Sequence, residues 1–470
     1  MAVPELNLDE SPRAATMPAI EPAGVLKPAP YIVDLYLEHL EEAGFLYEQR
    51  LLLLDDPQLT WRDLSDFEAR FEAHLDALLI GGDPALDVCV MRAAEADAGE
   101  LYAMALLFCR VDRLSAMMAV FEVVDADDAR KIAAISSALE QTLPEKWLME
   151  LLRSLGTGND VIDRVIARVI GYTRLKAAMP LISVLPRSGA TDSIVWALGR
   201  LRDSKAQAPL RSLMREHKDT DIRGAATQAL ARMGDLEALN ECQRQIFTEH
   251  WARFELGLAG GRSTVRALLA AVAKSPDVEG VLALGMLGDV QALPALVGFL
   301  RTEEFVAEAA SALELITGAG LYEEVFIADE IDPDELFEDE RKRFDRGESV
   351  SEGVDGATVR RLTRDPEKWT QWWRDNQSQF NGTMRYRYGK LYSPSVLIDA
   401  LADGCGGSRV CRELAYEELV IRYGADLAFE SDLPSQRQQA IVDRYREWAN
   451  ARIGQTQDGA WYFAGQLLAS

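Results

Sequence analysis

The sequence predicts an all-α fold: an α-solenoid of stacked helix pairs with extra helices at both ends. A large apolar residue followed by a small or short one recurs at steps of 26 to 32 residues. That period, filled with helix-forming residues and nearly free of strand signals, is typical of stacked helix pairs. The eight pairs are Leu107-Phe108, Leu139-Glu140, Ile170-Gly171, Leu198-Gly199, Leu230-Ala231, Leu256-Gly257, Leu284-Gly285 and Leu313-Glu314.

The best copies of the repeat share a longer pattern. The segments 197–203, 229–235 and 283–289 each begin Ala-Leu and end in Asp, and Pro209 and Pro294 follow the first and third. We expect the Ala and Gly positions to let two helices approach closely. The aspartates should cap the next helix, and each proline should lie in a first helical turn. The pattern is clearest from Ile170 to Gly318.

The N-terminal part divides at residue 30. Residues 1–30 contain six prolines, which indicates a disordered, Pro-rich lead. Residues 31–84 form a predicted N-terminal helical cap, with apolar residues at steps of three and four. We expect Gly81-Gly82 to stop a helix there and Asp83-Pro84 to start the next one.

The repeat solenoid is predicted over residues 85–320 and is followed by a charged segment. Residues 321–364 are interpreted as an acidic linker or insertion, since 321–355 hold fourteen Asp and Glu but four Lys and Arg. Residues 365–470 are predicted as a C-terminal helical region. Asp365-Pro366 and Ser393-Pro394 should each open a helix there, and the stretch Ile441–Trp448 should form the last one.

Composition limits the class of partner. The net charge of −26 and sequence pI near 4.7 disfavour duplex nucleic acid, whose phosphates such a surface repels. Five scattered cysteines do not form a disulfide framework, which favours a reducing, cytoplasmic setting. The sequence has no apolar run of membrane-spanning length and no secretory signal. No motif calls for a cofactor or a metal.

The repeated segments resemble HEAT repeats, including the short variety found in bilin lyases. HEAT repeats do not specify a chemistry. A closer resemblance rests on the two ends of the chain. It is carried by His39–Leu46, Arg70, Ala73–Leu78, Gly81-Gly82, Arg385–Lys390, Ser393-Pro394 and Gln436–Gln438. Together these resemble a family of uncharacterised bacterial HEAT-repeat proteins that are often encoded beside type VI secretion genes. The resemblance implies a link to that apparatus or its effectors, and no catalytic residue is carried over.

Three features of the sequence are candidate enzyme signals. The four histidines, His39, His74, His217 and His250, follow Glu or stand alone, the reverse of the His-Glu steps of iron-dependent HEAT hydroxylases. A structural or surface role is therefore favoured for them. The loop Gly257–Thr264 lacks the spacing of a phosphate loop and is interpreted as an inter-repeat turn. Cys405 and Cys411, among glycines, are the most enzyme-like place; a flexible turn is the simpler interpretation.

Two aromatic segments are candidate partner-binding sites. Tryptophans at 369, 372 and 373 share a helical face and could anchor a partner, although core packing is the commoner role of such a stripe. The run 385–392 is the one basic-aromatic segment. It could contact an acidic partner or RNA, or pair within the chain with the segment 321–355. The predicted partner-binding residues are Trp369, Trp372, Trp373, Arg385, Tyr386, Arg387, Tyr388 and Lys390.

The sequence favours a non-enzymatic, protein-binding scaffold linked to type VI secretion. A basic effector or a spike-associated protein would be the partner, and the chain would act as an adaptor, a chaperone or an immunity-type binder. The alternative is an enzyme of unknown reaction with a site near Cys405 and Cys411. A third hypothesis makes residues 321–355 a regulatory segment that occupies the concave face until it is displaced.

Overall fold

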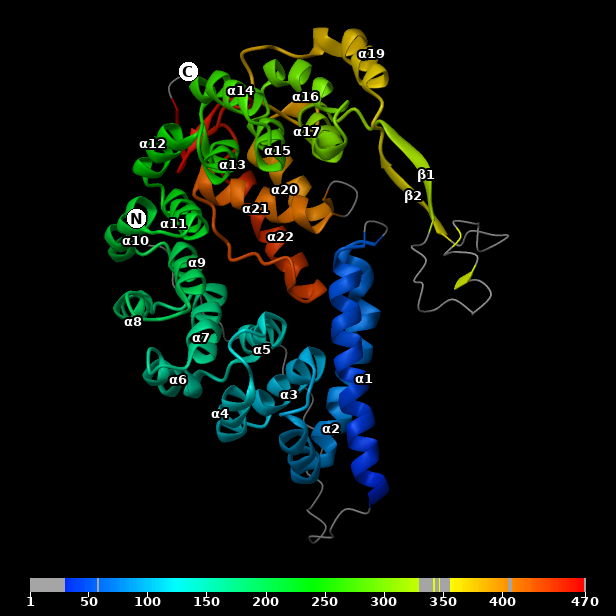
Figure 1. The fold of residues 1–470 in the computed structure, drawn as a ribbon, viewed down its shortest axis with the longest axis vertical. Helices are drawn as coiled ribbons and strands as arrows, with labels where there is room; N and C mark the ends of the chain where they lie inside the picture. The colour runs from blue at the N-terminus through cyan, green and yellow to red at the C-terminus, as the bar shows by residue number, and fades with distance from the viewer. Residues whose placement is uncertain are drawn as a thin grey trace.

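The repeats form a curved solenoid of two helical layers (Figure 1). The computed structural model describes residues 30–56, 59–328, 341–342, 346, 356–404 and 408–468. The inner layer consists of α3 (Ala98–Arg110), α5 (Ala129–Thr142), α7 (Asp160–Thr173), α9 (Thr191–Leu201), α11 (Thr220–Arg232), α13 (His250–Ala259), α15 (Val278–Leu287) and α17 (Val306–Thr317). The outer layer consists of α4 (Leu114–Val123), α6 (Leu148–Ser154), α8 (Ala178–Val184), α10 (Gln207–Glu216), α12 (Leu236–Gln245), α14 (Val265–Lys274) and α16 (Leu293–Phe299). The predicted all-α solenoid is confirmed.

The eight sequence pairs fall one in each inner helix, and each inner helix packs on the next. Their small residues allow the close approach that the pattern predicts. A Cβ atom placed on Gly285 would lie 2.5 Å from the Cα of Ala312, and one on Gly199 would lie 2.9 Å from the Cα of Ala229. The small residue of one repeat thus faces the alanine of the next, which explains why the two positions recur together.

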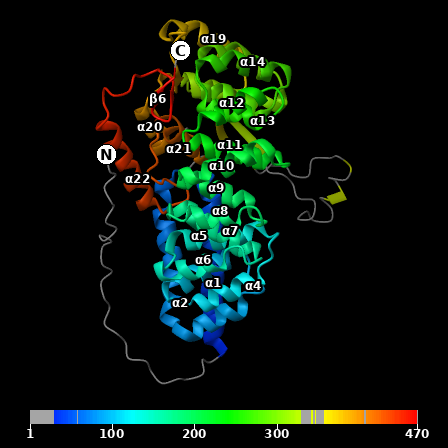
Figure 2. The same ribbon diagram turned by 90° about the vertical axis from the view of Figure 1, so that its left-hand side faces the viewer.

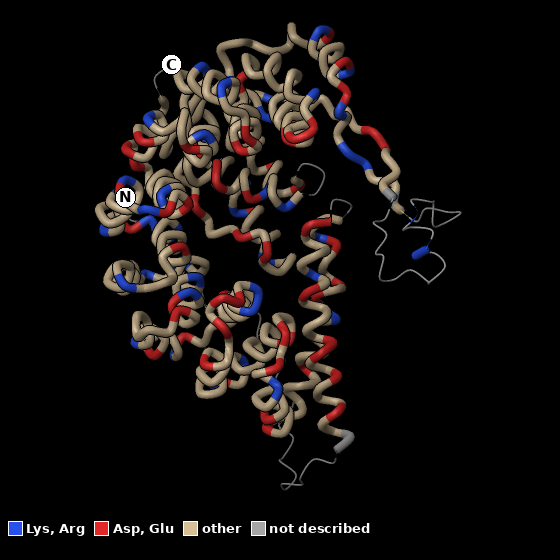
Figure 3. Tube along the Cα trace, in the orientation of Figure 1, with Lys and Arg blue, Asp and Glu red and all other residues tan. Residues whose placement is uncertain are grey.

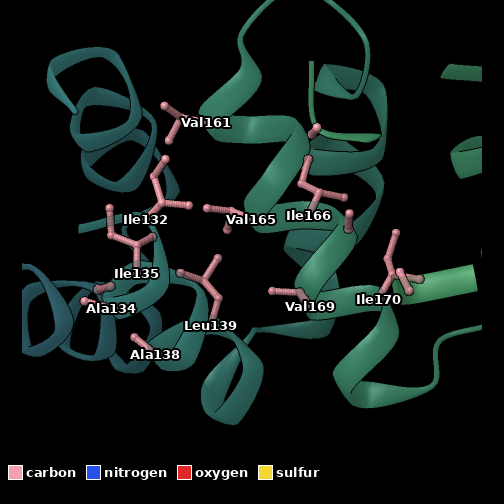
Figure 4. Packing of buried hydrophobic residues seen from close by; sticks show 14 of the residues in the cluster. Ile132, Ala134, Ile135, Ala138, Leu139, Val161, Val165, Ile166, Val169 and Ile170 are labelled. Carbon is pink, nitrogen blue, oxygen red and sulfur yellow. The ribbon is translucent and has the colours of Figure 1, made fainter. Parts of the chain in front are cut away.

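Between these contacts the core is aliphatic. Ile132, Ile135 and Leu139 of α5 face Val165 and Val169 of α7, and all five are buried (Figure 4). At ~25 cal/mol per Å² of apolar surface, such repeated burial is the main stabilising contribution of a solenoid.

The predicted caps are present at the turns between layers. Asp203, Asp235 and Asp289 each accept a hydrogen bond from the backbone N–H two residues ahead, at 2.9–3.0 Å. Pro294 lies in the first turn of α16. Each aspartate satisfies a backbone donor that the following helix would otherwise leave free.

The N-terminal cap consists of α1 (Pro30–Leu54), the 3₁₀ turn η1 (Trp61–Leu64) and α2 (Ser65–Arg92). The stretch labelled α2 consists of two helices that meet at Gly82, whose backbone is non-helical with φ +60° and ψ −146°, so the predicted stop at Gly81-Gly82 is confirmed. Asp83 and Pro84 begin the second of these helices, as predicted. The expected disordered lead at residues 1–30 lies outside the described residues, apart from the helical backbone at Pro30.

After α17 the chain forms a hairpin. β1 (Tyr322–Ala328) pairs antiparallel with β2 (Gly356–Leu362), so Glu323 lies opposite Arg361 and Glu324 opposite Arg360. The predicted acidic linker thus begins and ends as a strand, a feature that strand propensity did not reveal. Most of residues 329–355 lie outside the described residues.

The remaining elements form a C-terminal unit, which we define as residues 385–468. It contains β3 (Tyr386–Arg387), β4 (Lys390–Leu391), α20 (Pro394–Asp403), α21 (Arg409–Tyr423), α22 (Ser435–Asn450), β5 (Tyr462–Phe463) and β6 (Gln466–Leu467). It is preceded by α19 (Pro366–Asn376), which packs on α16 at the far end of the solenoid. Asp365 and Ser393 cap α19 and α20 as predicted.

The C-terminal unit lies on the concave side of the solenoid, between the inner helices and α1 (Figures 1 and 2). α21 packs against α11 and α13, and β3 against α17. The unit also reaches the N-terminal cap. The indole of Trp61 donates to the carbonyl of Ala402 at 2.8 Å, and Arg50 donates to the carbonyl of Asp432 at 3.0 Å. The concave face is therefore largely filled by the chain itself.

A cleft on the concave face

Two rows of side chains line the concave side of the inner helices, beside the C-terminal unit. Each residue of the first row lies three positions before the small residue of its repeat. Each residue of the second row lies one position after that small residue. The first row is Arg168, Trp196, Gln228 and Phe254, and the second is Tyr172, Arg200, Arg232 and Leu258. Since the two positions are four residues apart, both rows point from the same face of α7, α9, α11 and α13.

These rows form the floor of a cleft of about 480 Å³. Its other wall is the first half of α21, with Val410, Glu413 and Leu414, and the segment Phe429–Asp432. Phe254, Leu414 and Trp196 are half-buried and Val410 is exposed. The cleft therefore combines an apolar surface with paired charges, as sites that bind polypeptide often do.

The wall is fixed to the floor by a concave ion-pair cluster. We define it as Arg174, Arg200 and Arg232 of the solenoid together with Tyr416, Glu417, Asp426 and Glu430 of the C-terminal unit. Arg232 contacts Glu417 and, at 3.2 Å, Asp426; Arg200 lies 3.1 Å from Glu430. Arg174 donates to the hydroxyl of Tyr416 at 2.6 Å.

Burial and ion pairing together shift the pKa values of Asp426 and Glu430 in opposite directions. Burial works against ionisation of Asp426, but Arg174, Arg232 and the Tyr416 hydroxyl hold the pKa of its carboxyl below the usual range. Burial raises the pKa of Glu430, although Arg200 and Arg174 oppose that effect. The cluster therefore joins the two parts through charges that lie mostly out of water.

Glu140 of α5 lies beside the floor. Its side chain is fully buried, and Oε1 accepts from Nε of Arg168 at 3.2 Å, while Oε2 has no hydrogen-bond partner among the described residues. Burial raises the pKa of Glu140 to about 8, against the opposing charge of Arg168. Arg168 in turn lies over the ring of Trp196, 4.1 Å from its centroid. Glu140 thus links the first row to the solenoid core.

A second buried network explains the basic-aromatic run. Arg385, Arg387 and Arg422 surround the carboxylate of Glu418, and Tyr392 donates to it at 2.8 Å. All five residues are buried. We call them the buried arginine cluster. The expected contact of Arg385 and Arg387 with a partner is therefore corrected, because both are enclosed within the fold; so is internal pairing with the acidic segment, since Glu418 is the carboxylate they contact.

The same arginines cap inner helices. Arg385 donates to the carbonyls of Leu287 at 2.8 Å and Met286 at 2.7 Å, at the end of α15. Arg422 donates to the carbonyls of Gly257 and Gly260 at the end of α13. Helix C-termini carry partial negative charge. The ends of α13 and α15 therefore help Glu418 to neutralise the positive charges of the three arginines. Gly257–Thr264 is thus an inter-repeat turn that receives Arg422.

Tyr386, Tyr388 and Lys390, which were also predicted to bind a partner, differ in their burial. Tyr386 is buried and its N–H donates to the carbonyl of Gly288, so this prediction is also corrected. Tyr388 is half-buried with its N–H bonded to the carbonyl of Leu315, and Lys390 is exposed 3.6 Å from Asp399.

The three tryptophans lie at a separate groove. Trp369 is buried and its indole donates to the carbonyl of Thr363 at 2.9 Å, which is the packing role. Trp372 and Trp373 are half-buried. Together with apolar residues of α16 and α17 they line an apolar groove of about 270 Å³, which we call the tryptophan groove.

Among the described residues, the cysteines and histidines that were candidate enzyme signals do not form a catalytic arrangement. Cys411 is half-buried on α21, and Cys405 lies outside the described residues. No group of His, Cys, Asp and Glu within the described ranges is arranged to hold a metal ion. His39 and His74 bring their Nδ1 atoms within 3.2 Å of each other between α1 and α2. None of the helices that the structure describes has the length and apolarity needed to cross a bilayer.

The comparisons with known proteins agree with this architecture. Residues 190–241 match the family model of HEAT repeats, which covers α9, α11 and the outer helices between and after them. Residues 190–241 are therefore similar to HEAT repeats and lie within the all-α solenoid, and repeats of this class commonly mediate protein–protein interaction. Neither a curated protein nor a solved structure matches the chain.

Sequence reasoning did not find the two rows of the cleft. Their signal is present, because each row member stands at a fixed offset from a small residue that the repeat pattern identifies. Arg200 and Arg232 even lie 32 residues apart in matching positions. What the pattern could not supply was the opposite wall, which comes from residues about 200 positions away.

Proposed function

We propose that the protein is a non-enzymatic scaffold that binds another protein in the cleft between the inner helices and α21. The observation that carries this proposal is the floor of the cleft. Four consecutive repeats contribute the same two positions to it, and its aromatic residues Trp196 and Phe254 are half-buried. Aromatic and arginine side chains of this kind are enriched at protein interfaces.

The setting of this function follows from the resemblance of the chain ends. The partner is a protein of the type VI secretion apparatus, either an effector, which an immunity-type binder would neutralise, or a spike-associated protein that an adaptor or chaperone would load. The net charge of −26 supports a basic partner, since opposite charge accelerates association. A cytoplasmic site of action accords with the cysteine usage.

The tryptophan groove is a second contact region in this proposal. Trp372 and Trp373 line it from α19, and a partner that enters the cleft and extends along the solenoid would reach it at the far end. Its apolar lining suits one or two large side chains of the partner.

The experiment is an affinity purification from the native cell with quantitative mass spectrometry. The wild type is compared with Gln228→Trp, which fills the cleft from a half-buried floor position, and with Met179→Trp, a control on the exposed outer helix α8. We expect one protein at near-equal amount with the wild type and the control, and its loss with Gln228→Trp. Equal recovery with all three would refute binding in the cleft.

Two cellular assays then separate the two roles. Rescue of cells that express the recovered protein as a toxin indicates immunity. Loss of its delivery without any toxicity indicates an adaptor. Recovery of the chain alone, while the secretion system is expressed, would contradict the proposal.

A further inference from the structure

The outward face of α1 carries a regular stripe of side chains. Phe45 and Leu52 are seven residues apart and are 58 % and 65 % exposed. Glu38 precedes Phe45 by the same step, and Asp34, Glu41 and Glu48 form a parallel row with the same spacing. A seven-residue spacing keeps these side chains on one face of a helix. The stripe runs from Asp34 to Leu52, roughly 27 Å at 1.5 Å per residue.

No described element covers this stripe. α1 packs on α2 and α3 through its other faces, where Leu40, Ala43 and Tyr47 are buried. α1 forms one edge of the molecule, opposite the outer helices α6 and α8 (Figure 1), and Figure 3 shows acidic residues along its length. Large exposed apolar side chains repeated along a helix mark a surface that another helix can bury.

The charge of the stripe limits what can bind there. Asp34, Glu38, Glu41 and Glu42 are exposed around the two apolar residues. Of the neighbouring cations, Arg130 contacts Glu48 at 3.1 Å, and Arg92 contacts Glu95 and Glu100. The stripe is therefore a net negative surface with an apolar centre. A ligand that buries Phe45 and Leu52 must bring positive charge beside them.

This condition excludes the obvious occupants within the chain. A second copy of α1 would place acidic rows against each other, which costs free energy. Residues 1–29, next to α1 in sequence, hold four acidic and two basic residues, and 321–355 are strongly acidic. The basic run 385–392 has its two arginines buried around Glu418.

We infer that the outward face of α1 binds a basic amphipathic helix of another protein. The bound helix carries apolar residues seven positions apart, which pack on Phe45 and Leu52, and lysines or arginines between them, which pair with Glu38, Glu41 and Glu42. The inference rests on the proposed scaffold function and adds a second binding surface, separate from the cleft.

The test uses a synthetic peptide as the probe. It is a 21-residue helix with leucine at every seventh position, lysines three and four residues after each leucine and alanine elsewhere, and its control is a peptide of the same composition in scrambled order. Binding is measured by isothermal titration calorimetry at 0.15 M salt with the full chain. We expect one peptide per chain, and at least tenfold weaker binding of the scrambled peptide.

Variants then locate the peptide. Phe45→Glu with Leu52→Glu should weaken binding at least tenfold, and Met179→Glu on α8 should leave it unchanged. The inference would be overturned if the two peptides bound equally well, or if the double variant and Met179→Glu bound the peptide equally well. Binding would then come from the overall charge of the protein and not from the stripe on α1. A dimer that light scattering detects and that the double variant dissociates would overturn it too, since the stripe would then bind a second copy.

The outcomes do not depend on the cleft. Gln228→Trp should bind the probe normally, so a missing cleft partner and a missing α1 ligand are separate results.

Discussion

The Nη2 atom of Arg387 lies 2.6 Å from both carboxylate oxygens of Glu418, and neither side chain is more than 2 % exposed. Glu418 also accepts hydrogen bonds from Arg385, just before β3, and from Tyr392, just after β4, so a single carboxylate joins the β3–β4 hairpin region to α21. Because Arg385 also caps α15, this carboxylate connects the C-terminal unit to the solenoid. The concave face is thus built around buried charge.

Removing that carboxylate should be strongly destabilising. Glu418→Ala leaves three buried guanidinium groups without their shared anion, and breaking such a buried pair costs about 3–5 kcal/mol. Urea denaturation followed by circular dichroism measures the change, and Glu418→Gln should retain part of the stability through its amide oxygen. Glu413→Gln, on the same helix and half-exposed, is the control and should change stability by less than ~1 kcal/mol. A loss of under ~1 kcal/mol in Glu418→Ala would show that the buried arginine cluster is not needed.

The close approach of inner helices can be tested with two glycines. Gly285→Ala places a Cβ 2.5 Å from the Cα of Ala312, so the helices must separate, at a cost of about 1–3 kcal/mol. Gly298→Ala on α16 meets no atom within 4 Å and should stabilise the protein by up to ~1 kcal/mol through helix propensity. Thermal melting of the two variants checks the pair. Equal melting temperatures would contradict the packing role of the repeated small residue.

The concave ion-pair cluster should hold the C-terminal unit on the solenoid. Arg232→Ala removes the side chain that contacts Glu417, Asp426 and Tyr416, and leaves two carboxylates short of a partner. Hydrogen exchange in residues 409–432 should then rise at least tenfold, because the unit opens from the solenoid more often. Arg215→Ala, which removes an exposed ion pair with Glu237, is the control. Unchanged exchange in Arg232→Ala would mean that the arginine cluster alone secures the unit.

Glu140 should make stability depend on pH. Its pKa is about 8 in the folded protein and near 4.5 in the unfolded chain, so the folded state binds the extra proton between those values. The wild type should therefore lose stability relative to Glu140→Gln as pH rises from about 4.5 to 8, by ~1.4 kcal/mol for each pH unit at most. Denaturation at pH 5, 6.5 and 8 measures the difference. A flat difference for Glu140→Gln would show that its pKa is not raised.

The repeats were predictable from sequence because their signal is local. Each helix pair carries its own apolar face, small residue and cap within about thirty residues, so Gly285 and Asp289 reveal their roles without knowledge of the rest of the chain. The caps at Asp203 and Asp235 followed from the same reasoning.

The C-terminal unit was not predictable because its contacts are distant in sequence. Arg232 and Asp426 are 194 positions apart, and no periodicity relates them. Arg385 and Arg387 show the same limitation: a basic-aromatic run has the composition of an interaction surface, and only the position of Glu418 shows that it is enclosed.

The measurement that tests the central claim most directly is site-specific photo-crosslinking in the native cell. A benzoylphenylalanine in place of Gln228 reports on the floor of the cleft, and one in place of Met179 reports on the outer layer. The account predicts a covalent adduct with one other protein from position 228 and none from position 179. Adducts of equal yield at both positions, or none at position 228 while the partner is present, would contradict binding in the cleft.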